Sequence, residues 1–256
     1  MEAAFLNWRA VEFAIMKKKE FSYKLTPGRT LGSNYEIMEY LGGGYEGEVY
    51  KIVETRTGII RAAKLFYDRG GKKPRPMLKY ARKLYKLRSC PIIIQYHHQD
   101  KCRIRGQEVD FLVSDFADGE MLSSYLVRQR GRRLQPFEAL HLLYALVLGV
   151  EQIHFLGEYH GDIHSDNIMV KRQGLGYEVH LIDFYDLGRT SKEKIQADVF
   201  DLIAILHEMI GGKEHYASSP PVIKRIIMGR KQNLIQRRFK MAGHVRLALE
   251  NLDWDE

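Results

Sequence analysis

Cysteine is scarce in this 256-residue chain, which contains only Cys90 and Cys102. That count excludes a secreted fold held together by several disulfides and suits a reducing compartment, so we expect a cytoplasmic protein. Long apolar runs are also missing, because none approaches the ~18 residues needed to span a bilayer. No small-residue cleavage site follows the start of the chain, so a secretory signal is not expected.

The balance of charge is basic, with 40 Lys and Arg against 32 Asp and Glu and a formal net charge of +8. Such an excess suits acidic partners such as nucleotide phosphates, nucleic acid or an anionic surface, and it is equally typical of a solvated basic surface. We expect neither nucleic acid nor a membrane span among the interactions of this protein.

Residues 1–33 precede the part of the chain that carries motifs. Phe5, Trp8 and Ile15 recur at helical spacing and predict a helix whose apolar face packs on the rest of the protein. A helix that lies on a membrane surface or binds a partner is the alternative. Residues 26–33 are rich in turn formers and indicate a linker.

A glycine-rich turn lies between two alternating segments, 35–41 and 48–53. A dinucleotide-binding fold would continue from such glycines into a helix, whereas here a second strand follows. The pattern therefore predicts a glycine hairpin between two strands. The spacing G-x-G-x-x-G and the valine that follows it are met by Gly42, Gly44, Gly47 and Val49.

The segment 59–66 predicts the next strand, and Lys64 follows Ala62 and Ala63 within it. A lysine inside an apolar strand costs free energy unless its ammonium has a partner. Lys64 is therefore either a functional group or an edge lysine whose ammonium reaches solvent.

A helix is predicted over 77–88, because its apolar residues recur on one face while lysines and arginines fill the remainder. That basic face is either solvated, which we favour, or in contact with an acidic partner. Segments 91–96 and 108–114 predict two more strands joined by a polar connection. A zinc site built from the cysteines and from His97 and His98 is not expected, since adjacent residues of a strand point to opposite faces. Buried thiols are the better interpretation.

The segment His160–Val170 contains a loop in which Asp162 and Asn167 lie five residues apart. It follows a helix predicted over 136–156, and its last residues predict a short strand. A turn leads to a second strand that ends on Asp183. One carboxylate can orient an attacking hydroxyl, while an Asn and a second Asp can hold Mg²⁺, so this arrangement indicates phosphoryl transfer.

The order of these motifs, over residues 35 to about 205, resembles the protein-kinase-like superfamily. The glycine hairpin and Ala-Ala-Lys are similar to Ser/Thr protein kinases. The loop His-Gly-Asp-Ile-His-Ser-Asp-Asn is more similar to aminoglycoside, choline and lipopolysaccharide-core kinases. The resemblance implies an α+β, bilobal protein-kinase-like fold with a small antiparallel β N-lobe and a mainly α C-lobe. It implies an N-terminal extension and linker at 1–33, an N-lobe at 34–116 and a C-lobe at 117–256.

The resemblance also implies ATP and Mg²⁺ as cofactors. Asp162 and Lys64 would be the catalytic residues, and Asn167 and Asp183 would hold the metal. Asp198 would either hydrogen-bond the backbone of the Asp162 loop or cap the helix that it begins. The implied nucleotide-binding residues are Gly42, Gly44, Gly47, Val49, Ala62, Lys64, Asp115 and Ala117.

The chain departs from the family at several positions. No Glu lies between Lys64 and Gln107, although the family's helix supplies one to the strand lysine. Gly161 replaces an arginine that reads activation-loop phosphorylation, His164 replaces a lysine, and Tyr185 stands where the family has glycine. No Ala-Pro-Glu follows, so control by activation-loop phosphorylation is not expected.

Three functions fit these observations. We favour an atypical, bacterial-type Ser/Thr protein kinase. A small-molecule or sugar kinase is the alternative, so the acceptor is either a protein or a small-molecule hydroxyl. A nucleotide-binding pseudokinase that acts as an interaction module is the third, supported by the missing helix Glu and by Tyr185.

Overall fold

The computed structural model describes residues 22–44, 46–67, 75–174, 176–184 and 188–253. The helix expected within residues 1–16 lies outside these ranges, and so does Tyr185. The chain divides into two compact units, of which the first is Met1–Arg82 with Gln95–Phe116 and the second is Lys83–Ile94 with Ala117–Glu256. Residues 83–94, expected within the N-lobe, thus group with the second unit.

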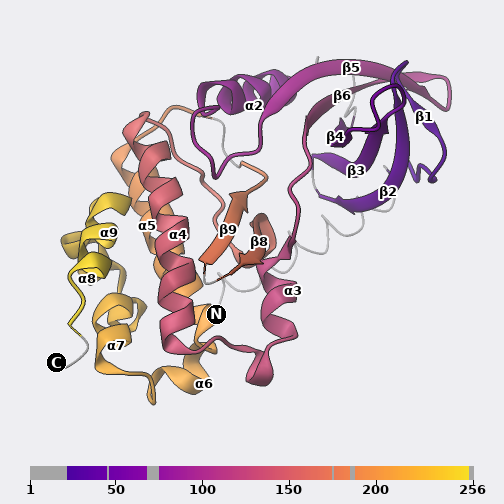
Figure 1. Ribbon diagram of the computed structural model, residues 1–256. Helices are drawn as coiled ribbons and strands as arrows, with labels where there is room; N and C mark the ends of the chain where they lie inside the picture. The colour runs from indigo at the N-terminus through magenta and orange to yellow at the C-terminus, as the bar shows by residue number, and fades with distance from the viewer. Residues whose placement is uncertain (1–21, 45, 68–74, 175, 185–187, 254–256) are drawn as a thin grey trace, which may run out of the picture. The chain divides into compact units, whose positions relative to one another are not determined.

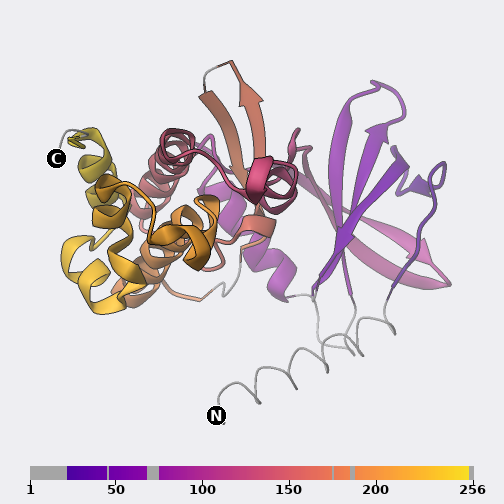
Figure 2. The ribbon, with the colours of Figure 1, turned by 90° about the horizontal axis from the view of Figure 1, so that it is seen from below.

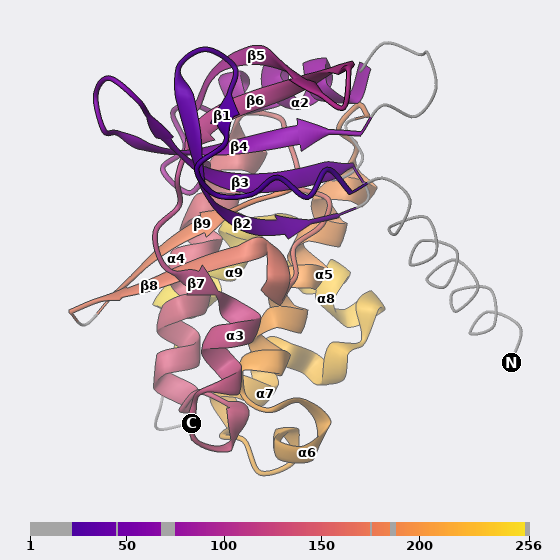
Figure 3. The ribbon, with the colours of Figure 1, turned by 90° about the vertical axis from the view of Figure 1, so that its right-hand side faces the viewer.

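The first unit contains a six-stranded antiparallel sheet (Figure 3). Buried residues of its strands, such as Tyr50, Ile52, Leu65 and Phe111, form the core of the unit. The order is β1-β2-β3-β4-β6-β5. The bounds are Thr30–Leu31 (β1), Tyr35–Gly43 (β2), Gly47–Glu54 (β3), Ile60–Phe66 (β4), Tyr96–Ile104 (β5) and Gln107–Asp115 (β6).

The strand expected over 91–96 is wrong in position. Ile93 makes only an isolated bridge to Leu181, and β5 begins at Tyr96. β5 then runs through the polar stretch that was expected to be a connection. It lies at the edge of the sheet, where one face of a strand stays solvated, so alternating polar residues are compatible with a strand.

Residues 23–31, which include part of the expected linker at 26–33, pack on the sheet of the first unit. Thr30–Leu31 pairs with the start of β2 as β1, and Leu25 and Leu31 are buried in the core. The backbone N–H of Tyr23 donates to the carboxylate of Glu48, at 3.2 Å from Oε1. This segment therefore packs on the sheet by apolar burial and by a hydrogen bond to a buried carboxylate.

The second unit is mainly helical, and the bounds of its helices and 3₁₀ turns follow (Figure 1). Helix α2, Arg75–Lys86, crosses the boundary between the units. The others are Leu122–Val127 (α3), Arg130–Arg132 (η1), Pro136–Phe155 (α4), Ser165–Asn167 (η2), Lys192–Met209 (α5), Gly212–Tyr216 (α6), Pro221–Ile227 (α7), Met228–Arg230 (η3), Gln232–Arg238 (α8) and Ala242–Glu250 (α9).

Helix α4 is the central helix of this unit. Pro136 opens it, and Gln135 and Glu138 form a reciprocal capping box at its N-terminus. It packs against α5 and α9, and Figure 2 shows these helices gathered together. Gly149 allows the chain at Ile92 to come close, since a Cβ at Gly149 would lie 2.4 Å from Ile92 Cδ1. The predicted helix over 136–156 is confirmed.

A three-stranded sheet, β7-β8-β9, completes the second unit. Its strands are Glu120–Met121 (β7), Ile168–Gln173 (β8) and Gly176–Leu181 (β9). β8 and β9 are the two strands predicted to flank the turn, and they bring Asn167 next to Ile182. Among helices in the described part of the chain, none has the length and apolarity that crossing a bilayer requires.

Candidate active site

The second unit brings Asp162, Asn167 and Asp183 together. The Asn167 amide nitrogen Nδ2 donates to both the carbonyl oxygen and Oδ2 of Asp162, each at 3.0 Å. Ile182 N donates to Asn167 O at 3.0 Å, so the residue after it, Asp183, begins beside Asn167. Asp183 has a left-handed φ of 55°, an uncommon conformation that turns the chain at the end of the hairpin. These residues thus meet where β8 begins and β9 ends.

Asp198 holds the backbone of the loop in shape. Its carboxylate accepts from His160 N at 2.7 Å and from Gly161 N at 2.8 Å, and it lies 3.1 Å from His154 Nε2. Its exposed fraction is 0%. The N-cap of α5 is Ser191, whose side chain accepts from Lys194 N, so the alternative role of Asp198 as a helix cap is wrong.

His160 lies inside the loop as a neutral ring. Burial lowers the pKa of His160 to about 4, so it carries no charge at neutral pH. Its Nδ1 accepts from Asp162 N at 3.3 Å, which makes Nε2 the protonated nitrogen that donates to Ile182 O at 3.1 Å. The ring also packs on Phe184, with centroids 4.7 Å apart. His160 therefore links the loop to the residues on either side of Asp183.

His164 keeps the carboxylate of Asp162 ionised. The His164 Nε2 lies 3.5 Å from Asp162 Oδ2. The hydrogen bond with His164 lowers the pKa of Asp162 and raises the pKa of His164. Asp162 is therefore charged at neutral pH, in the form that accepts a hydrogen bond from a hydroxyl.

Lys83 departs from the expectation of a solvated basic face on α2. Its side chain is only 7% exposed, and its Nζ lies over the rings of Tyr159 and Phe184, 4.0 and 4.8 Å from their centroids. Glu158 Oε2 lies 4.0 Å from the same Nζ. Attraction to two ring faces and a carboxylate offsets the cost of burying this cation. The other side chains of the basic face, such as Lys79 and Arg82, are exposed as expected.

The first unit carries the expected glycine hairpin. Gly47 cannot be replaced by a larger residue without movement, because a Cβ there would lie 1.9 Å from the Leu65 carbonyl oxygen. Gly44 N donates to Gly47 O at 2.9 Å, which closes the turn. A Cβ on Gly42 or Gly44 would meet no atom within 4 Å. Their lack of side chains therefore leaves the backbone open to a close approach from outside.

Lys64 finds its carboxylate within that hairpin. Its Nζ lies 3.4 Å from Glu46 Oε2 and 4.6 Å from the centroid of the Tyr80 ring, and its side chain is 13% exposed. Lys64 pairs across the sheet with Val49, which places it beside the glycine turn. Glu46 thus stands in for the helix glutamate that the sequence lacks, and Tyr80 of α2 adds a cation–π contact. The only sequence signal for Glu46 was its place inside the glycine motif.

Asp115 ends β6, but its groups are largely engaged. Its carboxylate contacts Arg61 Nη1 at 2.5 Å and His97 Nε2 at 2.6 Å, and its N–H donates to Gln95 O at 2.9 Å. Its carbonyl also accepts from Ser114 Oγ at 3.2 Å. The contact of Asp115 and Ala117 with adenine stays a prediction. Ala62 pairs with Ser114 in the neighbouring strand, next to this position.

Both cysteines are free thiols. Cys90 is buried and Cys102 is half-buried, and burial raises the pKa of both thiols, that of Cys102 to about 11. His97 and His98 point to different partners, Asp115 and Tyr35. No cluster of three or more His, Cys, Asp or Glu that could hold a metal ion occurs among the described residues.

The family model described as "Protein kinase domain" matches residues 35–200, more than half of the chain. The chain belongs to the protein kinase domain family. The match begins at β2 and ends within α5, so it includes the glycine hairpin, Lys64, the Asp162 loop and Asp198.

Curated relatives of this kinase domain are distant. A probable serine/threonine-protein kinase of Streptomyces coelicolor is 28% identical over 158 residues, which are 61% of this chain and 23% of that protein. Citron Rho-interacting kinase of Mus musculus is 24% identical over 77% of this chain and 9% of its own length. The chain therefore spans about a quarter or less of these relatives.

A solved structure shares the fold of this kinase domain. The PknI kinase domain of Mycobacterium tuberculosis aligns with a TM-score of 0.61 and 18% identity, over 88% of this chain and 98% of that chain. The predicted α+β kinase-like fold, with an antiparallel sheet first and helices after it, is confirmed.

Proposed function

We propose that this protein is an ATP- and Mg²⁺-dependent phosphotransferase, an atypical Ser/Thr protein kinase that transfers the γ-phosphate of ATP to a hydroxyl. The observation that carries the proposal is the grouping of Asp162, Asn167 and Asp183 on a loop braced by the buried Asp198. Asp162, whose lowered pKa keeps it in the ionised form, orients the acceptor hydroxyl and accepts its hydrogen bond.

The donors of this loop fit a magnesium ion. Asn167 uses its amide nitrogen on Asp162, so its amide oxygen can face a cation together with the Asp183 carboxylate. Two oxygen ligands from the protein suit Mg²⁺, which takes its remaining ligands from phosphates and water. When bound, the ion would neutralise charge on the transferred phosphate. The amides of the hairpin from Gly42 to Gly47 and the ammonium of Lys64 would hold the phosphates of the nucleotide.

A small-molecule kinase is the second candidate, and the loop itself favours it. Gly161 has a left-handed φ of 88°, which favours glycine over an arginine that could read a phosphorylated loop. His164, paired with Asp162, takes the place of a lysine. Both departures occur in the segment that is similar to aminoglycoside, choline and lipopolysaccharide-core kinases.

The test is transfer from labelled Mg-ATP to generic proteins and to small hydroxyl compounds. Labelling of a protein supports the protein kinase, and labelling of a small hydroxyl compound alone supports the second candidate. Asp162→Asn should lower kcat by about 100-fold or more, because it removes a general base, while ATP binding measured by calorimetry persists.

Asp166→Asn is the matched control, since Asp166 is an exposed carboxylate in the same loop and should leave kcat within about 3-fold of wild type. Absence of any transfer by the wild-type protein, with ATP binding intact, would leave only the pseudokinase interpretation.

A further inference from the structure

One face of α5 forms hydrogen bonds with the Asp162 loop. Asp198 holds the backbone of His160 and Gly161, and Glu208 Oε1 accepts from Ser165 Oγ at 2.7 Å. Asp201 lies between them on the same face of the helix, where burial first, and then the charges of Asp198 and Asp162, raise its pKa to about 6. The helix is thus fixed to the site along most of its length.

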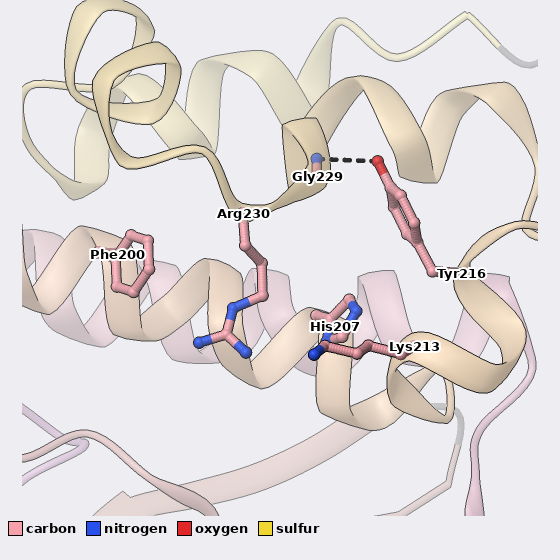
Figure 4. Close-up of a pocket in the computed structure, with 6 residues that line it drawn as sticks. All are labelled: Phe200, His207, Lys213, Tyr216, Gly229 and Arg230. Carbon is pink, nitrogen blue, oxygen red and sulfur yellow. Dashed lines mark hydrogen bonds between the residues drawn. The ribbon is translucent and has the colours of Figure 1, made fainter. Parts of the chain in front are cut away.

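A neighbouring face of α5, about 100° around the helix, opens on a pocket of about 370 Å³. Figure 4 shows the residues that line it. Histidine, lysine and arginine side chains are present, and none of the described lining residues is acidic. The expected kinase site uses none of them. The lining residues are Phe200, His207, Lys213, Tyr216, Gly229 and Arg230, which we call the cationic pocket.

The turn that carries Arg230 has an unusual backbone. Met228, Gly229 and Arg230 have φ values of 49°, 61° and 56°, all left-handed, and for the two non-glycine residues this costs roughly 1 kcal/mol each. Tyr216 Oη fixes the turn by accepting from Gly229 N at 2.8 Å. In Figure 4 the Arg230 side chain reaches from this turn toward α5, between Phe200 and His207. Such a costly turn places a guanidinium in the pocket.

Arg230 and Lys213 are the charged groups that line the pocket, and they favour the uncharged form of His207. Burial first, and then the charges of Arg230 and Lys213, lower the pKa of His207. Arg230 lies over the Phe200 ring, 5.6 Å from its centroid, so its guanidinium plane is supported from one side. An anion with several oxygens would offset the repulsion between the positive charges of Arg230 and Lys213. It would also pair with the guanidinium through two hydrogen bonds.

We propose that the cationic pocket binds a phosphate monoester carried by the acceptor protein, next to the hydroxyl that is to be phosphorylated. This inference rests on the proposed kinase function of the same unit. Its geometric basis is α5, where His207 lines the pocket and the next residue, Glu208, contacts Ser165 of the Asp162 loop at 2.7 Å. One acceptor segment can therefore reach both the catalytic loop and the pocket. A cationic acceptor of the aminoglycoside type would be repelled here.

Binding is tested on the full chain without nucleotide. Titration calorimetry with O-phosphoserine should show binding, whereas serine should show none. Arg230→Gln and Lys213→Gln should each weaken phosphoserine binding about 10-fold, the loss expected for one charge-assisted hydrogen bond. Arg237→Gln, which removes an exposed arginine from the adjacent α8, is the matched control and should bind like wild type.

Melting temperatures of the variants without ligand show whether each is folded. Equal phosphoserine affinity in wild type and in both folded pocket variants would overturn the proposal. The same titration with inorganic phosphate shows whether the pocket prefers a phosphate monoester. Phosphoserine should bind more tightly than inorganic phosphate, and equal affinity would indicate a site for free phosphate instead.

The activity test compares casein with dephosphorylated casein as acceptors. The wild-type kcat/KM should be about 10-fold higher for the phosphorylated form, and Arg230→Gln should bring this ratio close to one. A wild-type ratio of one would overturn the role of the pocket in acceptor choice. Failure to label either protein would count against the proposed function, while the calorimetry still decides whether the pocket binds a phosphate monoester.

Discussion

Lys64 illustrates how a single residue can obtain its partner from an unexpected place. The ammonium of a lysine within a sheet needs either a carboxylate partner or contact with solvent, and α2 contains no Glu. Glu46, inside the glycine hairpin, lies 3.4 Å from the ammonium, and the Tyr80 ring lies on another side. Under the proposed function, nucleotide phosphates would compete with Glu46 for the same ammonium, because both are anionic.

Glu46→Gln should therefore strengthen ATP binding. The Glu46 side chain is about a third exposed, so the pair contributes no more than ~1 kcal/mol and the KM for ATP should fall by up to about 5-fold. Lys64→Met should cancel the effect of the substitution, because no cation then remains for Glu46 to hold. A rise in KM for Glu46→Gln would instead mean that Glu46 positions Lys64 for the phosphates.

The residues of the candidate site differed in how far the sequence predicted them. Asp162 and Asn167 were predicted because they lie five residues apart in one loop, and Asp183 was predicted because it ends the following hairpin. Glu46 was not, since its contact with Lys64 depends on the register between β3 and β4. Asp115 was named as a nucleotide-binding residue, and only the structure shows that its backbone N–H donates to Gln95 O.

At the scale of elements, α5 holds the Asp162 loop in shape. Asp198 projects from it into a fully buried position and accepts two backbone N–H groups and a contact from His154. A buried carboxylate is stable only with such partners, and the buried N–H groups in turn need an acceptor. Sequence alone left two roles for Asp198, and only the start of α5 at Lys192 decided between them.

Asp198→Ala should destabilise the protein strongly. It leaves buried N–H groups and His154 without their acceptor, which we expect to lower the free energy of unfolding by about 3 kcal/mol or more in chemical denaturation. Glu193→Gln, an exposed carboxylate on the first turn of the same helix, should change it by less than about 1 kcal/mol. Equal effects of the two substitutions would show that Asp198 does not hold the loop.

At the scale of the whole molecule, the net charge of +8 favours acidic acceptors. Long-range attraction raises the rate at which an oppositely charged partner is encountered, and salt screens it. The cationic pocket adds a local site for negative charge within this field.

Salt should therefore weaken the use of an acidic acceptor. Between about 50 mM and about 300 mM NaCl, the kcat/KM for casein should fall about 10-fold. A basic acceptor such as myelin basic protein should show no such loss. If both acceptors responded to salt alike, electrostatic attraction to the acceptor would not explain the basic charge of this chain.

Apart from β5, the sequence by itself determined the main element types and the order of the motifs, because alternation, helical periodicity and glycine spacing act between near neighbours along the chain. It therefore predicted β2, β3, α4 and the Asp162 loop. Only the tertiary structure decided which distant groups meet: Glu46 with Lys64, Lys83 with Phe184, Asp198 with His160, and Arg230 with Phe200. These contacts depend on strand register and helix packing, in which burial and charge pairing between remote residues outweigh local preference.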